Sequence, residues 1–248
     1  MCLKKGKELF SNLKFLKVNK IFKFKKFNIL QNNSVFKIGT DSVLLGCFAD
    51  IHNASHILDI GTGTGILSLM CAQRNPISHI TAMDSEYNAY SLALENFKNS
   101  SFSQRIRGIH CDLDRFFSDI LFDYIICNPP YFKISEVLHR KHPVARQQIK
   151  LNYHLLIKKS ASLLSQNGKI GYIFPIENEQ EILELSNRYN LFPNRIIYIS
   201  GIRNGKIKRI FLELSREDKN PIIENFVIEE KSRIWSEEYK KLTSEFYL

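Results

Sequence analysis

Long apolar segments and paired cysteines are both missing from this 248-residue chain. No uninterrupted apolar run approaches the roughly 18 residues that a membrane span needs, and the N-terminus lacks the apolar core of a signal peptide. The five cysteines form no CxxC pair and no even-numbered framework, so their spacing indicates neither a zinc site nor a disulfide scaffold. These absences predict a cytoplasmic protein without a metal site or membrane attachment.

Acidic residues are also in short supply. The chain has 35 lysines and arginines against 25 aspartates and glutamates, which gives a formal net charge of +10. Nine of the lysines lie within residues 1–26, where Glu8 is the sole acid. Such an excess favours an acidic partner, meaning nucleic acid, an anionic membrane surface or an acidic protein. The alternative interpretation is a solvated lysine-rich surface that reflects composition alone.

Apolar runs of strand length alternate with segments of helical period through most of the chain. Strands are predicted at 55–60, 79–84, 105–112, 122–127, 169–175, 195–200 and 208–214, and helices at 66–74, 86–100, 151–168 and 178–190. This alternation predicts an α/β fold with a mostly parallel sheet, helices on both of its faces and an antiparallel edge. No repeat or low-complexity linker divides the chain, so we expect a basic arm at 1–21 and a single domain at 22–248.

The sequence LDIGTGTG places three glycines where a predicted strand meets a predicted helix. Glycine permits a tight turn and lets a ligand approach main-chain N–H groups at a helix N-terminus, which suits an adenosine-containing cofactor. A dinucleotide site would have its third glycine where this chain has Ile66. Instead, Asp59 precedes Gly61, Gly63 and Gly65, a spacing that resembles motif I of the class I S-adenosylmethionine-dependent methyltransferases.

Two more acids end the next two predicted strands. Asp84 can accept hydrogen bonds from ribose hydroxyl groups, and Asp112 can accept one from an adenine amino group. Both belong to the carboxyl edge of the sheet, where open α/β sheets bind ligands. Capping of the following helix is the alternative role for each carboxylate. Together with Asp59 and the glycine spacing, these acids predict an S-adenosylmethionine site.

The predicted strand at 122–127 runs into the sequence NPPY. The side-chain oxygen of Asn128 and the carbonyl of Pro129 can each accept one N–H of a planar amino group, so that its lone pair faces the methyl donor. Tyr131 can stack on the flat face of the target. A proline turn without chemistry is the alternative. Following a loop of the motif I type, CNPPY resembles motif IV, the (N/D)PP(Y/F) signature of methyltransferases that act on adenine N6 or on glutamine amides.

Both ends of the chain carry a more specific resemblance. The segment 22–49, FKFKKFNILQNNSVFKIGTDSVLLGCFA, resembles the opening of the bacterial tRNA1(Val) adenine-N6 methyltransferases, and KRIFLEL and YKKLTSEFYL resemble that family's closing strand and C-terminus. The resemblance implies a Rossmann-like fold with a seven-stranded sheet and S-adenosylmethionine as cofactor. It also implies that 22–54 covers the cofactor, that 55–248 forms the core, and that the target is adenine-37, beside the anticodon of a valine tRNA.

The same resemblance implies further contacts to the cofactor. Lys37, Gly39, Thr40 and Asp41 would lie near the carboxylate and methionine end of S-adenosylmethionine. A helix N-cap is the alternative role for Thr40 or Asp41.

tRNA is the implied partner, and we expect no DNA, membrane or obligate protein partner. Phosphates supply most of the affinity for RNA, so basic residues near NPPY and in the N-terminal segment are candidate contacts. These are Arg140, Lys141, Arg146, Lys23, Lys25 and Lys26. Among the interleaved aromatic residues, Phe24 is expected to pack the arm onto the domain.

Three other functions stay open at this point. A release-factor glutamine methyltransferase shares NPPY but has a substantial helical domain before motif I, whereas fewer than 60 residues precede Asp59 here. A DNA adenine-N6 methyltransferase needs a target-recognition region, for which no segment is large enough. A non-catalytic RNA-binding protein would have no use for a methyl-donor site.

Overall fold

The computed structural model describes residues 20–35, 37–129 and 153–248. Its strands are β1 (Lys20–Lys23), β2 (Asn28–Gln31), β3 (His56–Ile60), β4 (His79–Asp84), β5 (Ile106–His110), β6 (Phe122–Cys127), β7 (Leu164–Pro175), β8 (Phe192–Ile202), β9 (Ile207–Ser215), β10 (Ile222–Lys231) and β11 (Ile234–Trp235). Its α-helices are α1 (Thr40–Phe48), α2 (Ile66–Arg74), α3 (Tyr87–Lys98), α6 (Tyr153–Leu163), α7 (Glu179–Arg188) and α8 (Glu237–Thr243). Within these ranges, no helix has the length and apolarity needed to cross a membrane.

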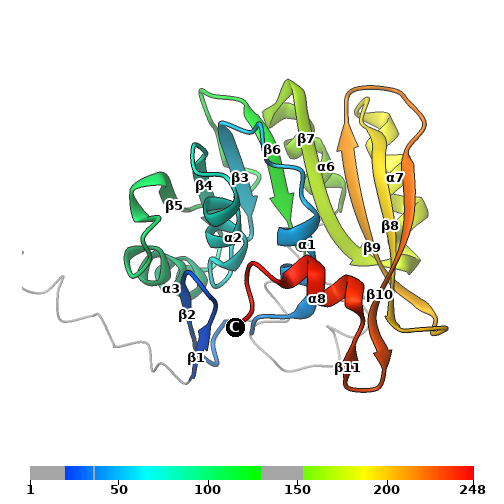
Figure 1. Ribbon diagram of the computed structural model, residues 1–248. Coiled ribbons are helices and arrows are strands. Elements are labelled where there is room, and N and C mark those ends of the chain that lie inside the picture. Colours follow the sequence, from blue (N-terminus) through cyan, green and yellow to red (C-terminus); the bar gives the residue numbers. More distant parts are fainter. Residues whose placement is uncertain (1–19, 36, 130–152) are drawn as a thin grey trace, which may run out of the picture.

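One large sheet organises the described part of the chain (Figure 1). Its nine strands follow the order β11-β10-β8-β9-β7-β6-β3-β4-β5, while β1 and β2 form a separate antiparallel hairpin. The strands from β5 to β7 pair in parallel. In contrast, β9 is antiparallel to both β7 and β8, and the edge strand β11 is antiparallel to β10. The predicted fold class, α/β with a mostly parallel sheet and an antiparallel edge, is confirmed.

The sheet is wider than the seven strands that the resemblance implies. β10 pairs in parallel with β8 and β11 follows it, so the antiparallel pair predicted at 195–214 lies inside the sheet instead of at its edge. All residues of β10 are exposed or half-buried. They therefore lack the apolar alternation by which a core strand is recognised in a sequence.

Two predicted boundaries are wrong. The helix predicted at 151–168 ends at Leu163, and β7 begins at the next residue. Gly168 lies within β7 and not at a helix end, and a Cβ atom there would be 2.9 Å from the carbonyl oxygen of Phe122. Glycine therefore permits a close approach to the neighbouring strand. The third predicted strand ends at His110, which places Asp112 in the loop that follows.

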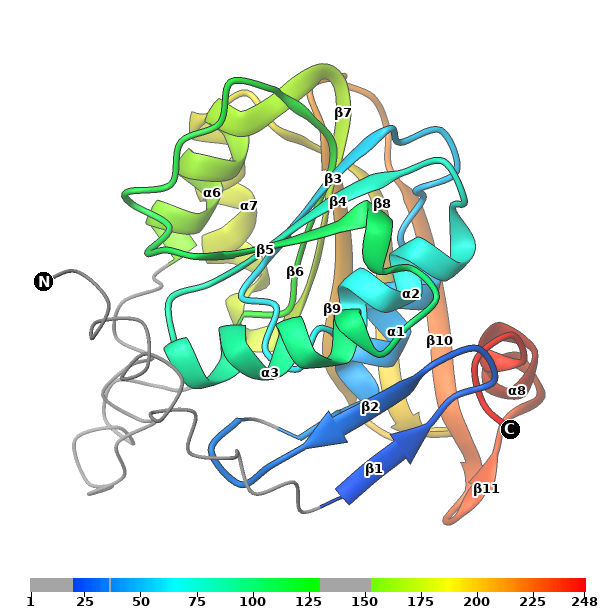
Figure 2. The ribbon, with the colours of Figure 1, turned by 90° about the vertical axis from the view of Figure 1, so that its left-hand side faces the viewer.

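Helices cover both faces of the sheet (Figure 2). One buried apolar cluster contains residues of α1, α2, α3 and α8, and the other contains residues of α6 and α7. Along β6, Tyr124 and Ile126 belong to the first cluster, whereas Ile125 and Cys127 belong to the second. Successive side chains of a strand point to opposite faces, so a continuous apolar run such as that of β6 is required when both faces are buried.

The N-terminal hairpin meets the C-terminus of the chain (Figure 1). Phe24 is only 4% exposed, and its ring stacks on Tyr247 at a centroid distance of 5.8 Å. The backbone N–H of Lys25 donates to the carbonyl of Phe246 at 2.8 Å. The predicted packing of Phe24 onto the domain is confirmed.

Candidate active site

The carboxyl ends of β3, β4 and β6 meet at one edge of the sheet. In the register, Asp59 of β3 lies beside Ala82 of β4 and beside Ile126 of β6. The glycine loop therefore starts next to the point where β6 runs into Asn128. This arrangement follows from parallel pairing, because parallel strands that start at one edge all end at the other.

The glycine loop has the conformation that its composition predicts. Gly61, Gly63 and Gly65 have φ angles of 71°, 58° and 84°, in the left-handed region that favours glycine. The N–H groups of Gly61 and Thr62 both donate to the carbonyl of Met83 at 2.9 Å, which ties the loop to β4. A Cβ atom at Gly61 would meet nothing within 4 Å. The loop thus presents open space in front of its backbone.

Asp59 is fully buried beneath this loop. Its Oδ2 accepts hydrogen bonds from Thr62 Oγ1 at 2.6 Å and from Ser68 Oγ at 2.7 Å. Its Oδ1 has no hydrogen-bond partner among the described residues. Burial raises the pKa of the Asp59 carboxyl to about 6, against the lowering effect of the two hydroxyl groups. A cationic ligand group would favour the ionised form of this carboxylate.

Asp84 lies at the end of β4 and organises the loop. Its Oδ2 accepts the N–H of Gly63 at 2.9 Å, and its Oδ1 accepts the N–H of Glu86 at 2.9 Å. Burial raises the pKa of this carboxyl, although these backbone donors lower it. Neither Asp59 nor Asp84 is the N-cap of the following helix, because Gly65 is the N-cap of α2 and Glu86 is the N-cap of α3. The capping alternative is therefore wrong for Asp84.

Asp112 reaches the same edge from β5. The N–H of Cys111 donates to the carbonyl of Asp84 at 3.1 Å, which holds the loop after β5 against β4. The Asp112 carbonyl accepts the N–H of Arg115, and its side chain is half-buried. This neighbourhood agrees with the predicted place of Asp112, and its contact to an adenine amino group stays a prediction.

Asn128 and Pro129 follow β6 directly. Pro129 is buried and Asn128 is half-buried. The side-chain nitrogen of Asn128 donates to Ser42 Oγ in α1 at 2.8 Å. The segment before the first core strand thus reaches the predicted catalytic asparagine. Tyr131 lies outside the described residues.

The residues predicted to cover the cofactor lie around the start of α1, and they differ in exposure and in contacts. Gly39, and not Thr40 or Asp41, is the N-cap of α1, so the capping alternative is wrong. Thr40 is exposed, as is Lys37. Asp41 Oδ2 accepts a hydrogen bond from Arg209 Nε on β9 at 2.9 Å. The contacts of these residues to S-adenosylmethionine stay predictions.

The predicted RNA contacts divide into two groups. Lys23, Lys25 and Lys26 are exposed on the hairpin. Lys25 Nζ donates to the carbonyl of Ser244 at 2.7 Å, which gives it a structural role as well. Those outside the described residues are Arg140, Lys141 and Arg146.

Three further hydroxyl residues belong to the site but are not predicted from the sequence: Ser42, Thr62 and Ser68. Thr62 and Ser68 hold the motif I carboxylate, and Ser42 contacts Asn128. The positions of Thr62 and Ser68, three and nine residues after Asp59, are a local signal that could have identified them. Ser42 has no such signal, because it is 86 residues from Asn128.

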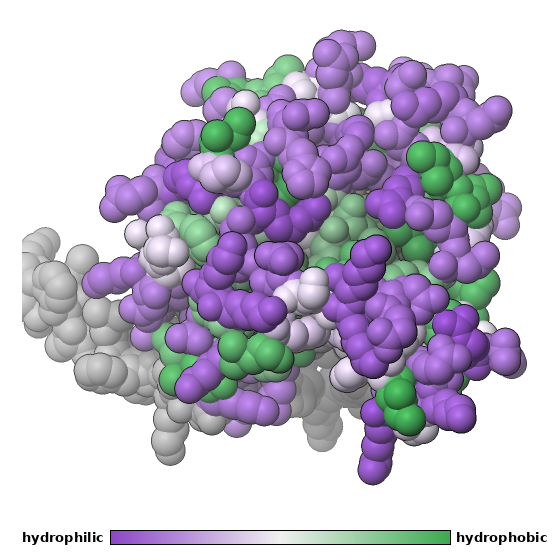
Figure 3. Space-filling model, viewed as in Figure 1, coloured by the Kyte–Doolittle hydropathy of each residue, from purple (hydrophilic) through white to green (hydrophobic). Residues whose placement is uncertain are grey.

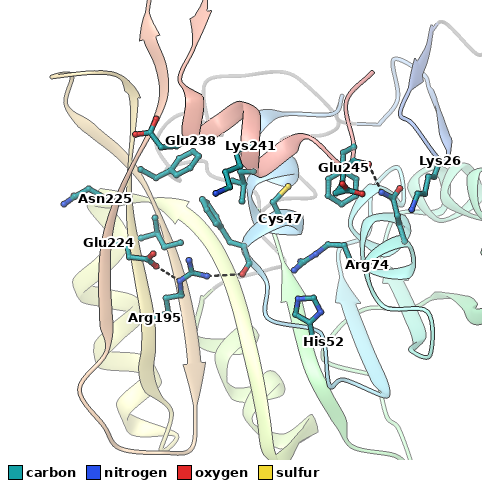
Figure 4. A pocket seen from close by; sticks show the side chains of 16 residues that line it. Lys26, Cys47, His52, Arg74, Arg195, Glu224, Asn225, Glu238, Lys241 and Glu245 are labelled. Atoms are coloured by element: carbon teal, nitrogen blue, oxygen red, sulfur yellow. Dashed lines mark hydrogen bonds and ion pairs between the residues drawn. The ribbon is translucent and has the colours of Figure 1, made fainter.

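A separate hollow of about 720 Å³ lies at the far ends of α1 and α2 (Figure 4). Arg195 of β8 bridges Glu224 of β10 and the carbonyl of Phe48, at 2.5 and 3.4 Å. The face that contains this hollow is mostly hydrophilic, with hydrophobic residues visible near its middle (Figure 3). The hollow meets α2 at Arg74, whereas the glycine loop precedes the first residue of α2. It is therefore distinct from the site at the carboxyl edge.

The described residues of the site fit an S-adenosylmethionine molecule. Its open glycine loop can admit a ligand against the backbone, and the unpaired Oδ1 of Asp59 offers an acceptor to a positively charged group. In the described residues, no group of three or more His, Cys, Asp or Glu side chains could hold a metal ion.

Some known proteins are similar to this chain in sequence, and others are similar to it in fold. The model of the methyltransferase small domain family matches residues 26–179. A tRNA1(Val) (adenine(37)-N6)-methyltransferase of a Flavobacteriaceae bacterium (strain 3519-10) is 42% identical over 229 residues, which cover 92% of this chain and 98% of that protein. A protein of the same name from Vibrio cholerae is 38% identical over 232 residues, which cover 93% of this chain and 96% of that protein.

Two solved structures show the same architecture. One is described as a predicted O-methyltransferase from Agrobacterium tumefaciens, with a TM-score of 0.65, 17% identity and coverage of 83% of this chain and 96% of that one. The other is a ribosomal protein L11 methylase from Lactobacillus delbrueckii, with a TM-score of 0.54, 18% identity and coverage of 75% and 84%. At this identity they support the fold alone. The relatives that match in sequence identify the family as well: the chain belongs to the tRNA1(Val) (adenine(37)-N6)-methyltransferase family.

Proposed function

We propose that this protein is a cytoplasmic enzyme that transfers a methyl group from S-adenosylmethionine to the N6 nitrogen of adenine-37 in tRNA1(Val). The observation that carries the proposal is the placement of Asn128 at the end of β6, beside the glycine loop and the buried Asp59. The relatives supply the substrate, since their names specify this adenine of this tRNA.

The cofactor would lie along the carboxyl edge of the sheet. Asp84 would accept the ribose hydroxyl groups, while it keeps the N–H of Gly63 in place. Asp112 would accept the adenine amino group. The buried carboxylate of Asp59 would face the positively charged end. When bound, S-adenosylmethionine supplies an electrophilic methyl group attached to a positively charged sulfur.

The protein residues would have to make the aromatic amino group of adenine reactive toward the methyl group. The lone pair of an adenine amino nitrogen is delocalised into the ring, so the planar group is a poor nucleophile. Asn128 Oδ1 and the Pro129 carbonyl would each accept one N–H and favour a pyramidal nitrogen whose lone pair is directed at the methyl group. The nitrogen would lose one proton to water after the transfer, so no side chain has to remove a proton before attack.

The basic surface supports RNA as the substrate. The exposed lysines of the hairpin and the net charge of +10 provide attraction for phosphates. Tyr131 would stack on the target base. An adenine in an anticodon loop is already unpaired, so its entry into a site requires less energy than the extrusion of a base from a duplex.

Labelled S-adenosylmethionine provides the direct test. The purified protein is incubated with total tRNA from a strain that lacks the modification, and the labelled nucleotide is identified and mapped. We expect N6-methyladenosine at position 37 of tRNA1(Val). Release factor and duplex DNA serve as parallel substrates, and label in either of them, without label in tRNA, would contradict the proposal.

Substitutions can separate the two halves of the site. Asn128→Ala should remove most turnover and leave the affinity for S-adenosylmethionine nearly unchanged, because its amide acts on the substrate nitrogen. Asp84→Ala should weaken cofactor binding first, since it removes both the ribose acceptor and the partner of Gly63. Calorimetric titration of the cofactor and single-turnover assays measure the two effects. Equal loss of cofactor affinity in both variants would refute these roles.

A further inference from the structure

The turn that joins β8 to β9 carries a cluster of positive charge near the candidate active site. Residues 202–209, with the sequence IRNGKIKR, contain four basic residues and no acidic one. Every residue from 202 to 208 except Gly205 is exposed. We propose that this turn is a phosphate-binding surface that holds the backbone of the anticodon loop next to the target adenine. This inference rests on the proposed function and names a tRNA contact besides the lysines of the N-terminal hairpin.

The turn lies at the carboxyl edge of the sheet, because β9 is antiparallel to β7. The first residues of β9 lie beside the last residues of β7, and Arg209 pairs with Pro175. Strand β6, which leads to Asn128, has β3, β4 and β5 on one side and β7, β9 and β8 on the other. Figure 1 shows the hairpin of β1 and β2 across β6 from β8 and β9. With the cofactor across the ends of β3 to β5, the target nucleotide would approach from the side of this turn.

Two contacts of α1 bring the start of β9 close to Asn128. Arg209 Nε donates to Asp41 Oδ2 at 2.9 Å. The next residue of α1, Ser42, has its Oγ 2.8 Å from the side-chain nitrogen of Asn128. Only β7 separates β6 from β9, which corresponds to about 10 Å at a strand spacing of about 4.8 Å. Lys208, which directly precedes Arg209, is therefore near enough to contact the phosphates that flank a nucleotide bound at Asn128.

The arginines and the lysines of the turn differ in their contacts. Both arginines form ion pairs with acidic side chains of the protein. Within the described part of the chain, Lys206 and Lys208 form no ion pair. Lys208 also has no partner on β8, because Ile199 pairs with Arg209 and the next residue of β8 pairs with Ile207. Such a bulge directs a side chain away from the regular sheet surface, and two exposed ammonium groups so close in the chain favour a polyanion.

Replacement of both lysines by glutamine should weaken tRNA binding selectively. We expect the double variant Lys206→Gln/Lys208→Gln to raise the Kd for tRNA by about 10-fold. The slope of log Kd against log salt concentration should fall by about 1.4, since each contact to a single-stranded phosphate contributes about 0.7. The affinity for S-adenosylmethionine and the single-turnover rate at saturating tRNA should change by less than about 2-fold. The double variant Lys206→Arg/Lys208→Arg keeps both charges and should bind tRNA like the wild type.

A matched control removes the same charge elsewhere. Lys158 of α6 and Lys219 are exposed, and Lys219 follows the end of β9 at the opposite edge of the sheet, where Ser215 pairs with Lys169. Lys158→Gln/Lys219→Gln should change the Kd for tRNA by less than about 2-fold and leave the salt dependence nearly unchanged. Equal loss of affinity in the two glutamine variants would show an effect of net charge alone and would overturn the proposal.

An isolated anticodon stem-loop RNA locates the contact. Lys206→Gln/Lys208→Gln should weaken the binding of this RNA by the same factor as that of full-length tRNA, whereas a loss seen only with full-length tRNA would overturn the proposal. Unchanged affinity and salt dependence in a protein that methylates tRNA would overturn this inference and leave the proposed function standing. The expected loss of binding, in a protein that transfers no methyl group to tRNA, would refute the proposed function and support the surface.

Discussion

Ionisation of the buried Asp59 carboxyl destabilises the ligand-free protein. Its pKa is about 6, against an ordinary value of 3.8, because burial outweighs the hydrogen bonds from Thr62 and Ser68. An acid whose pKa is higher in the folded state binds its proton more tightly there. Stability contributed by this group is therefore present below about pH 4 and is lost as the pH rises to about 6. The loss is on the order of 3 kcal/mol.

Asp59→Asn should remove this dependence on pH. The neutral amide can still accept from the two hydroxyl groups, so we expect the variant to gain free energy of unfolding relative to the wild type as the pH rises from 4 to 7. Urea denaturation of both proteins across this range measures the difference. The variant should also bind S-adenosylmethionine more weakly at pH 7, because the negative charge that attracts the cation is absent. A stability difference that stays constant with pH would contradict this account of Asp59.

At the scale of the element, the loop between β3 and α2 requires glycine at Gly61 and at Gly65 for two different reasons. A Cβ atom at Gly65 would be 2.5 Å from Cε1 of Phe97 in α3, so this glycine is required by packing as well as by its φ of 84°. At Gly61, a Cβ atom would meet none of the described residues within 4 Å, so among them the φ of 71° is the constraint that favours glycine.

Alanine substitutions should separate these two reasons. Gly65→Ala combines left-handed strain of about 1 to 2 kcal/mol with overpacking of about 1 to 3 kcal/mol. Gly61→Ala should lose only the strain energy but should weaken cofactor binding, because its methyl group would occupy the ligand's space. Urea denaturation and cofactor titration of the two variants form a matched pair. The prediction fails if Gly61→Ala is the less stable variant or binds the cofactor normally.

At the scale of the whole molecule, the two ends of the described chain stabilise each other. Phe246 and Tyr239 of the C-terminal segment are 2% and 3% exposed and belong to the same apolar cluster as Phe24 and α1. The hairpin that carries the lysines is therefore held by residues more than 200 positions away.

Phe246→Ala should lower the free energy of unfolding by about 3 to 5 kcal/mol, as expected for a large side chain removed from a core. It should also weaken tRNA binding, because the hairpin loses its support. Leu248→Ala is the matched control, since Leu248 is 85% exposed and should change stability by less than about 0.5 kcal/mol. Urea denaturation and a tRNA gel-shift assay measure both effects. Similar stability of the two variants would contradict the proposed support.

The fold and the cofactor half of the site can be predicted from local patterns. Asp59 and its glycines are contiguous in the sequence, and the apolar runs of β3, β4 and β6 are long and continuous, so each can be recognised alone. The exposed residues of β10 offer no such pattern. The early start of β7 escapes prediction because the apolar run through Leu163 and Leu164 fits a helix equally well.

The sequence by itself determined the α/β class, the three acids, the glycine spacing and the asparagine that follows β6, because each of these depends on neighbours along the chain. Only the tertiary structure decided that Ser42 holds Asn128, that Asp41 pairs with Arg209, and that the C-terminus supports the basic hairpin. These contacts join residues that lie 86, 168 and more than 200 positions apart. Whether such residues meet depends on the packing of helices and strands, which no local pattern specifies.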